Sequence, residues 1–404
     1  MNILFLTIGY FESIEAHSIY ADLLRCFRND GHEVYVITPH EKRTGKKTEL
    51  VEESGVHILH IETGNVTKAS NLIQKGLAQL LIEPIFIKAI KTYFSYVKFD
   101  LVMYSTPPIT FYKAVEYVKK RDGAESYLLL KDIFPQNAVD LEMMIKSGLK
   151  GCIYKYFRRK EKNLYAISDR IGCMSRANAD YVISHNPEIK KDKVEICPNS
   201  VEPVDMRISN QERTALRKKY GLPLGKKIFV YGGNLGRPQD VPFIVKCLKA
   251  CADIDDVYFI IAGSGTDRHF LEEYIEAEKP KHVKLFGFIP KSEYDKMIAC
   301  CDVGLIFLDH RFTIPNFPSR LLSYMQAGLP VFACTDPNTD VGKVIVDGGF
   351  GWWSESNSVE NFMKVIQIIT NSDISHYGEN GFKYLNNNYK ACDAYQTIIN
   401  YDLR

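Results

Sequence analysis

The chain has 404 residues, of which 46% are hydrophobic and 25% are charged, and its formal net charge is +2. This length is too great for one hydrophobic core and predicts two domains. The small net charge gives no overall field that attracts nucleic acid, so we expect no nucleic-acid partner. We find neither the regions of a signal peptide nor an apolar run of membrane-spanning length. The expected location is the cytoplasm.

The ten cysteines are scattered along the chain. Cys247 and Cys251 can share a helix face, and Cys300 and Cys301 are adjacent. Neither pair has the spacing of a zinc site or of a disulfide framework. We therefore expect no metal ion, and buried free thiols in a reducing compartment.

The first half of the chain alternates between strand and helix patterns. An apolar strand at 2–6 leads to Gly9, a helix follows at 18–28, and a second strand is predicted at 32–38. This order is that of a βαβ unit in a parallel sheet. Later strands of this half are predicted at 101–104, 127–130 and 170–174.

The same pattern restarts near Lys226. A strand at 227–231 ends in Gly-Gly-Asn-Leu-Gly, a helix is predicted at 242–253, and a strand at 257–262 runs into Gly-Ser-Gly. Further strands are predicted at 283–286, 303–307, 331–333 and 351–353. The polar, proline-containing stretch 199–225 is the expected boundary between the halves. Two α/β halves of this kind imply a cleft between them, with ligands at the carboxyl ends of the strands.

The glycine loop of the second half suits a phosphate. Gly232, Gly233 and Gly236 allow close backbone approach to an anion at a helix N-terminus, and Arg237 follows to neutralise it. The alternative is a strand-to-helix turn that needs glycine only to bend.

The segment 313–333 reads TIPNFPSRLLSYMQAGLPVFA. Pro318 and Ser319 are predicted to begin a helix, with the Ser319 hydroxyl helping to satisfy its first amides. Gly328 and Pro330 end that helix before an apolar strand. The segment resembles the donor-site helix of the family 4 glycosyltransferases. The fold of that family, GT-B, has two Rossmann-like α/β domains facing across a cleft.

Other motifs match the family in order and spacing, namely 231–236, 261–265, 286–290 and the Pro-Asn-Ser-Val turn at 198–201. The resemblance implies a retaining, metal-independent transferase without a cofactor, whose donor is a nucleotide diphosphate sugar. It places Ser319 and Arg320 near the phosphates and Ser323 at the ribose. The donor-binding candidates are Gly9, Gly233, Asn234, Gly263, Ser264, Phe288, Ile289, Pro318, Ser319 and Ser323.

The chain departs from the family at the charged positions. The usual pair of glutamates falls on Pro315 and Ser323, and the usual arginine and lysine fall near Asn234 and Gln239. We therefore expect the arginines at 237 and 320 to stabilise the leaving group.

The candidates of the first half lie on its loops. Asp132 is the third catalytic candidate, orienting the acceptor or the donor sugar, and its alternative role is to cap a helix near Pro135. The acceptor-side candidates are Glu12, Glu15 and Lys131, and surface placement is the alternative for the two glutamates.

The stretch 146–163 interleaves cations with aromatic residues. Such helices lie on anionic membrane surfaces, for which the candidates are Lys155, Arg158, Arg159 and Lys160. A second apolar stretch, 72–97, carries lysines and is expected to break at Pro84. The alternative for both stretches is an amphipathic helix packed on the sheet.

Together these features predict an acceptor domain at 1–200, a nucleotide-sugar domain at 201–385 and a C-terminal helix at 386–404 that returns to the first domain. The expected reaction moves an N-acetylated aminosugar or a deoxysugar from a UDP-sugar to a polyprenyl-diphosphate-linked saccharide at the inner membrane face, in bacterial capsule or O-antigen synthesis. The alternative within the fold is a nucleotide-sugar epimerase. A periplasmic-type binding protein is disfavoured by the missing signal peptide, and a dehydrogenase by the missing GxGxxG motif.

Overall fold

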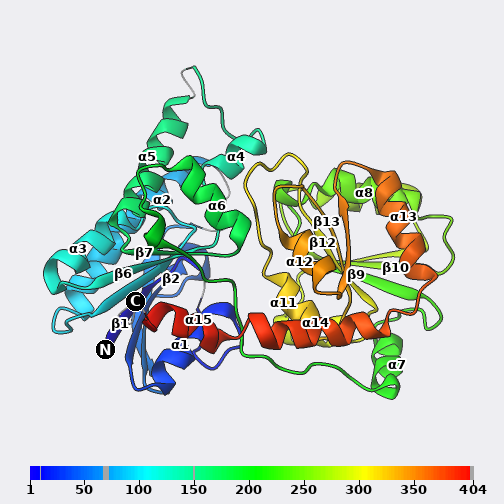
Figure 1. The fold of residues 1–404 in the computed structure, drawn as a ribbon, viewed down its shortest axis with the longest axis horizontal. Coiled ribbons are helices and arrows are strands. Elements are labelled where there is room, and N and C mark those ends of the chain that lie inside the picture. The colour runs from blue at the N-terminus through cyan, green and yellow to red at the C-terminus, as the bar shows by residue number, and fades with distance from the viewer. Residues whose placement is uncertain (10, 67–71, 149–150, 401–404) are drawn as a thin grey trace. The chain divides into compact units, whose positions relative to one another are not determined.

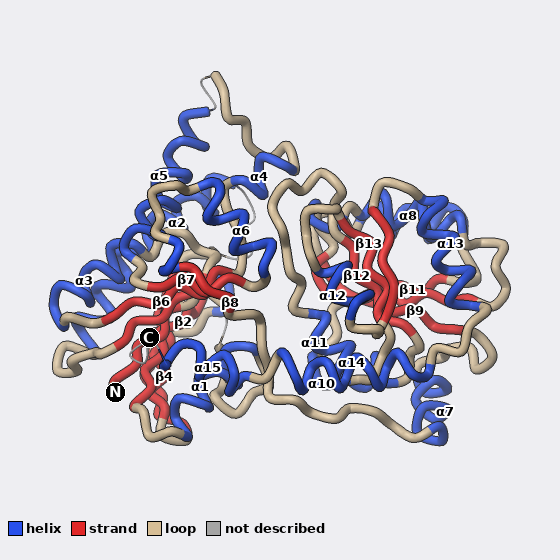
Figure 2. The backbone as a smooth tube through the Cα atoms, in the orientation of Figure 1, coloured by secondary structure: helices blue, strands red, loops and turns tan. Residues whose placement is uncertain are grey.

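A computed structural model describes residues 1–9, 11–66, 72–148 and 151–400. The chain forms two compact units (Figure 1). The first contains Met1–Glu202 and the chain from Ala391 onward, and the second contains Pro203–Lys390. Each unit is built on one sheet with helices packed on it (Figure 2).

The first unit carries a sheet in the order β3-β4-β2-β1-β5-β6-β7-β8, in which β3 alone is antiparallel to its neighbour. Its strands are β1 Asn2–Leu6, β2 Glu33–Glu41, β3 Glu49–Glu53, β4 Val56–Thr63, β5 Leu101–Ser105, β6 Glu125–Leu130, β7 Arg170–Cys173 and β8 Val194–Ile196. Its helices are α1 Ile19–Asn29, α2 Leu72–Tyr93, α3 Tyr112–Asp122, α4 Gln136–Asp140, α5 Gly151–Ile167, α6 Arg176–His185 and α15 Ala391–Ile399, with short 3-10 turns at Lys42–Thr44 and Lys191–Lys193.

The second unit carries an all-parallel sheet in the order β11-β10-β9-β12-β13-β14. Its strands are β9 Lys227–Asn234, β10 Val257–Ser264, β11 Val283–Phe286, β12 Val303–Phe307, β13 Val331–Thr335 and β14 Gly351–Glu355. Its helices are α7 Asn210–Lys219, α8 Val241–Ala250, α9 His269–Glu278, α10 Lys291–Ala299, α11 Arg320–Gln326, α12 Val341–Asp347, α13 Val359–Thr370 and α14 Ser375–Asn388, with a 3-10 turn η3 at Arg237–Gln239.

Burial on both faces explains why the central strands read as apolar runs. Every residue of β5, β12 and β13 is buried, which is typical of parallel sheets covered by helices on both sides. Counted along the second unit, its strand order is 3-2-1-4-5-6, the doubly wound Rossmann order. The order reverses between β9 and β12, so the carboxyl ends of these two strands are where a ligand is expected.

The structure corrects several boundaries. The predicted break at Pro84 is wrong, because α2 runs through it from Leu72 to Tyr93. A proline inside a helix removes one hydrogen bond, and here the buried side chains of Ile82, Phe86 and Ile90 hold the helix in place. Strands β3, β4 and β8 were not predicted, and β2 continues to Glu41. No helix in the described ranges is both long and apolar enough to cross a membrane.

The C-terminal helix α15 packs on α1 of the first unit. Arg170, at the start of β7, donates from Nη1 to the Ile398 carbonyl at 2.6 Å and from Nη2 to the Thr397 carbonyl at 2.7 Å. The same guanidinium pairs with Glu195 on β8. The buried Arg170 guanidinium therefore donates hydrogen bonds to the last carbonyls of α15, which have no partner within the helix.

We expect Arg170→Met to lower the free energy of unfolding by about 3–5 kcal/mol, because it removes the cationic partner of Glu195 and the donor to two carbonyls at the helix end. Urea unfolding measures the loss, and limited proteolysis should cut the variant first near α15. Arg159→Met, on an exposed position of α5, is the matched control and should change neither result. Equal stability of the two variants would contradict this account of how α15 is held.

Candidate active site

Two glycines allow β9 and β10 to run side by side to their carboxyl ends, next to the point between β9 and β12 where the strand order reverses. Gly233 and Gly263 are register partners, with φ values of +139° and +144°. A Cβ on Gly263 would lie 1.8 Å from the Gly233 carbonyl oxygen, and a Cβ on Gly233 would lie 2.9 Å from the Arg320 guanidinium. Both positions therefore require glycine for steric and backbone reasons.

Arg320 fills the space that Gly233 leaves open. It is the first residue of α11, and its guanidinium carbon lies 4.3 Å from the centre of the Tyr231 ring. Its Nη1 is buried without a hydrogen-bond partner. Burial by itself lowers the pKa of Arg320, but the surrounding tyrosine hydroxyls outweigh it and the pKa is raised. The guanidinium thus stays charged at the carboxyl end of β9, with donor capacity to spare.

A group of tyrosines supports this arginine. The Tyr231 hydroxyl donates to the Asn234 carbonyl at 2.6 Å, and the Tyr324 hydroxyl lies 3.2 Å from the Val230 carbonyl. Tyr294 of α10 occupies the space beside Gly232. None of these tyrosines was singled out from the sequence. Tyr231 stands directly before the glycine pair and could have been noticed in the sequence. Its cation–π contact could not, because Arg320 lies far along the chain.

The other donor candidates lie on the same strand ends and the loops that follow them. Asn234 and Ser264 are exposed register partners, and Asn234 Nδ2 donates to Gln239 at 2.8 Å. The exposed Arg237 begins η3. Phe288 follows β11 and is 80% exposed, whereas Ile289 is partly buried.

The N-terminus of α11 differs from the prediction in how Ser319 is used. The helix begins at Arg320 with Ser319 as its N-cap residue, and the Ser319 side chain makes no capping hydrogen bond. The expectation that its hydroxyl satisfies the first amides is therefore wrong, because Ser319 has helical dihedral angles rather than the extended ones of a capping serine. Pro318 and Ser323 are partly buried on either side of this turn.

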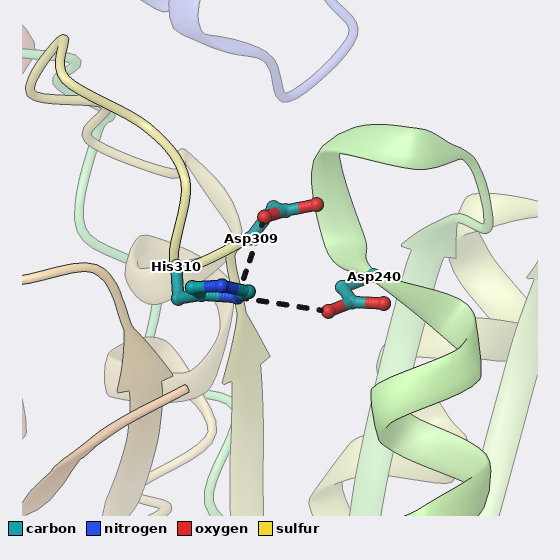
Figure 3. A group of neighbouring side chains, drawn as sticks. All are labelled: Asp240, Asp309 and His310. Carbon is teal, nitrogen blue, oxygen red and sulfur yellow. Dashed lines mark ion pairs between the residues drawn. The ribbon is translucent and has the colours of Figure 1, made fainter. Parts of the chain in front are cut away.

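Asp240, Asp309 and His310 form a cluster of potential metal ligands at the ends of β12 and η3 (Figure 3). His310 Nδ1 lies 3.6 Å from Asp309 and 4.0 Å from Asp240. Arg311 pairs with Asp309 at 2.6 Å, so one of the two carboxylates is already neutralised. Burial, and then the nearby Asp309, raise the pKa of Asp240. These two carboxylates and the imidazole form a group of polar side chains beside the strand ends.

In the first unit, Asp132 follows β6 at the carboxyl edge of the sheet. Asn137 Nδ2 donates to both carboxylate oxygens, at 2.9 and 2.8 Å. Burial raises the pKa of Asp132 to about 6, against the hydrogen bonds that lower it. The capping alternative is wrong, because α4 has Pro135 at its N-cap and no side-chain capping bond. Asn137, whose buried Oδ1 has no hydrogen-bond partner, was not predicted.

Lys131 precedes Asp132 and lines a small cavity with α1 residues Ile19, Tyr20 and Leu23. Its Nζ lies 3.4 Å from the Cys197 carbonyl, and burial lowers its pKa.

The remaining loop candidates are more exposed. Glu15 pairs with Arg28 at 2.8 Å, and this hydrogen bond lowers the pKa of Glu15, which does not favour it as a base. Glu12 is exposed, and Gly9 turns the chain through hydrogen bonds with Thr7 and Thr38.

The four cations of α5 divide into two kinds. Arg158 pairs with Glu161 at 2.6 Å, and Lys160 pairs with Glu83 of α2 at 2.7 Å. Lys155 and Arg159 are exposed, as are the apolar side chains of Ile153 (56%) and Tyr156 (41%) on the same helix. The sequence spacing could not separate the two kinds because it does not show which face packs inward.

Two family models together match most of the chain. The model described as Glycosyltransferase Family 4 matches residues 18–204, and the model described as Glycosyl transferases group 1 matches residues 212–383. The chain belongs to glycosyltransferase family 4. It is accordingly a glycosyltransferase, and the loops at Gly233, Gly263 and Arg320 lie in the part matched by the group 1 model.

Relatives and solved structures agree with this assignment. A probable glycosyltransferase, WbjE of Pseudomonas aeruginosa, is 23% identical over 79% of this chain and 78% of its own. The putative colanic acid biosynthesis glycosyl transferase WcaI of Escherichia coli is 22% identical over 61% of this chain and 60% of its own. The crystal structure of Anabaena Alr3699/HepE in complex with UDP has a TM-score of 0.70 at 16% identity, covering 98% of both chains. The fold is GT-B.

Asp132→Asn tests the titration in the first unit. The unfolded chain releases the Asp132 proton near pH 4, whereas the folded protein holds it to about pH 6. The folded wild type therefore loses stability as pH rises through this window, and the variant lacks that loss. Urea unfolding measured between about pH 4 and pH 6 should show the free energy of unfolding of the wild type falling relative to that of Asp132→Asn. Parallel profiles would contradict the raised pKa.

Proposed function

We propose that this glycosyltransferase uses a UDP-sugar and that Arg320 binds its diphosphate. The observation that carries the proposal is the free, buried Nη1 of Arg320 beside Gly233, at the strand ends where the sheet order reverses. A charged guanidinium with open donors suits phosphate oxygens. Neighbouring glycines leave room for a phosphate to approach the backbone. The similarity in fold to a protein crystallised with UDP supports the choice of nucleotide.

The nucleoside end of the donor is assigned to the loop after β11. Phe288 offers an exposed ring, and a nucleobase can stack on it. Ser323 lies one turn into α11 and is assigned to the ribose, as the family resemblance implies. We also assign Arg237, the first residue of η3 after the glycine loop, to the phosphates.

As the resemblance implies, the reaction needs no enzyme nucleophile that attacks the anomeric carbon from the face opposite the leaving UDP. The UDP leaves while the acceptor hydroxyl attacks from the same face and passes its proton to the departing diphosphate oxygen, so the configuration is retained, as the resemblance implies. Negative charge grows on the diphosphate as the bond breaks. Arg320 and Arg237 would stabilise that charge, and one such contact is worth roughly 10²–10³ in rate.

We assign the acceptor to the first unit. The Asp132 carboxylate, with a pKa of about 6, is ionised at neutral pH and can accept a hydrogen bond from a sugar hydroxyl. The unpartnered Oδ1 of Asn137 offers a second acceptor next to it. Lys131 supplies a positive charge near the same edge of the sheet.

The acceptor we propose is a saccharide on a polyprenyl diphosphate, and the outward face of α5 is the proposed contact with an anionic membrane. Lys155 and Arg159 provide charge on that face, and Ile153 and Tyr156 provide apolar surface. Basic residues alternating with apolar ones are typical of helices that lie at the membrane interface. The colanic acid name of one relative supports a role in making a cell-surface saccharide. The added sugar is proposed to be an N-acetylated aminosugar or a deoxysugar.

Replacing Arg320 by methionine should weaken UDP binding about 10–100-fold and leave uridine binding unchanged, because the lost charge-assisted hydrogen bonds of about 1.5–3 kcal/mol reach the phosphates alone. Phe288→Ala should weaken UDP and uridine by the same factor, since base stacking contributes about 1–3 kcal/mol to both. Isothermal titration calorimetry measures the affinities of the wild type and of each variant for UDP and for uridine. Uridine serves as the internal control for folding of the arginine variant. An equal loss for UDP and uridine in Arg320→Met, or no loss for either, would refute the assignment.

The double change Lys155→Glu and Arg159→Glu should weaken binding to phosphatidylglycerol vesicles at least about 30-fold, because each cation contributes about 1 kcal/mol at an anionic surface. Co-sedimentation measures the bound fraction. The control is Lys218→Glu with Lys383→Glu, two exposed lysines of the second unit whose change alters net charge equally. If both pairs bind alike, the outward face of α5 is not the membrane contact. Arg158 and Lys160 are unsuitable for this test because their ion pairs also stabilise the fold.

A further inference from the structure

Two cysteines far apart in the sequence meet where the C-terminal helix packs on α1. Cys26 is in the last turns of α1 and Cys392 is the second residue of α15, 366 positions later. Their Sγ atoms lie 2.6 Å apart. A disulfide bond is about 2.05 Å long, so the two sulfurs need to move only slightly closer to bond.

The two thiols differ in access. Cys26 is 9% exposed, whereas Cys392 is exposed. Burial and the neighbouring sulfur raise the pKa of the Cys26 thiol. An oxidant from solution therefore meets Cys392 first, and Cys26 can react only with the sulfur beside it.

The helices that carry the thiols are firmly placed on both sides of the pair. The Ala391 amide donates to the Val201 carbonyl at 2.9 Å. At the other end of α15, Arg170 donates to the Ile398 and Thr397 carbonyls. Between them, the Tyr395 hydroxyl bonds to Asp30 and its ring packs edge-on against Phe27 at 4.8 Å. Side chains held in reacting geometry behave as reactants at a very high effective concentration.

We propose that Cys26 and Cys392 form a reversible disulfide that fixes the C-terminal helix to α1. The oxidant is a small-molecule disulfide such as oxidised glutathione. The Cys392 thiolate attacks it, forming a mixed disulfide and releasing one glutathione thiolate. Cys26, as it loses its proton, then attacks Cys392 Sγ, forming the protein disulfide and releasing the second glutathione. Two protein thiols lose two electrons, and one glutathione disulfide becomes two thiols.

The other exposed thiol provides an internal standard. Cys152 lies on α5 and is exposed, and among the described residues no sulfur is placed beside it. Its reaction with oxidised glutathione should stop at the mixed disulfide. The remaining cysteines are buried.

The test incubates the folded full-length protein with oxidised glutathione, blocks free thiols by alkylation and maps the peptides without reduction. We expect a peptide pair joined through Cys26 and Cys392. Glutathione on Cys392 should be at least about tenfold less abundant than on Cys152, because the second step is intramolecular. In Cys26→Ser, glutathione should accumulate on Cys392 to the level at Cys152. In Cys392→Ser, Cys26 should remain unmodified.

A second measurement uses the wild type alone. The oxidised protein should unfold at a higher temperature than the reduced protein, because a cross-link between distant residues restricts the unfolded chain. A reductant should reverse the shift, and Cys152→Ser should not abolish it. Glutathione persisting on Cys392 of the wild type as fully as on Cys152, with no joined peptide pair, would overturn the proposal.

Discussion

The contact between the Arg320 guanidinium and Gly233 is the constraint around which the second unit is arranged. The arginine occupies space that a side chain at position 233 would take, and it rests on the ring of Tyr231. Gly263 must in turn lack a side chain because the Gly233 carbonyl lies against it. The Arg320 guanidinium therefore excludes a side chain at position 233, and the Gly233 carbonyl excludes one at position 263. The result is a charged group at the carboxyl edge of the sheet, where anionic ligands of this fold class bind.

The surroundings of Arg320 contain tyrosines in place of carboxylates. The resemblance implies that Pro315 and Ser323 stand where the family usually has glutamates, so neither position offers a carboxylate to the arginine. The tyrosines around Arg320 raise its pKa without neutralising it, because hydroxyl groups carry no charge at neutral pH. A guanidinium held by rings and not by ion pairs keeps its donors for a ligand. A buried arginine–carboxylate pair would have used those donors within the protein.

In the first unit, a carboxylate and an amide, Asp132 and Asn137, lie together at the carboxyl edge of the sheet. Asp132 is enclosed enough to have a pKa of about 6, and Asn137 supports both of its oxygens. On α5, the same short run of cations serves two purposes. Arg158 and Lys160 join the helix to its surroundings through ion pairs, while Lys155 and Arg159 remain in solvent. The C-terminal helix completes this unit through Arg170 and through the meeting of Cys26 with Cys392.

Local patterns in the sequence were sufficient for the family, the two α/β halves and the strands that end in glycine loops. Apolar runs and glycine punctuation are short-range signals, and the strands at 283–286 and 303–307 match the structure residue for residue. Such signals could not show that α2 continues through Pro84, that Ser319 leaves its helix uncapped, or that Asn137 holds Asp132. Tertiary packing decided these features, because each depends on which side chains from distant segments fill the same space. The same reason applies to Arg320, which the sequence marked as a cation near a phosphate and only the fold placed over Tyr231 with a free donor.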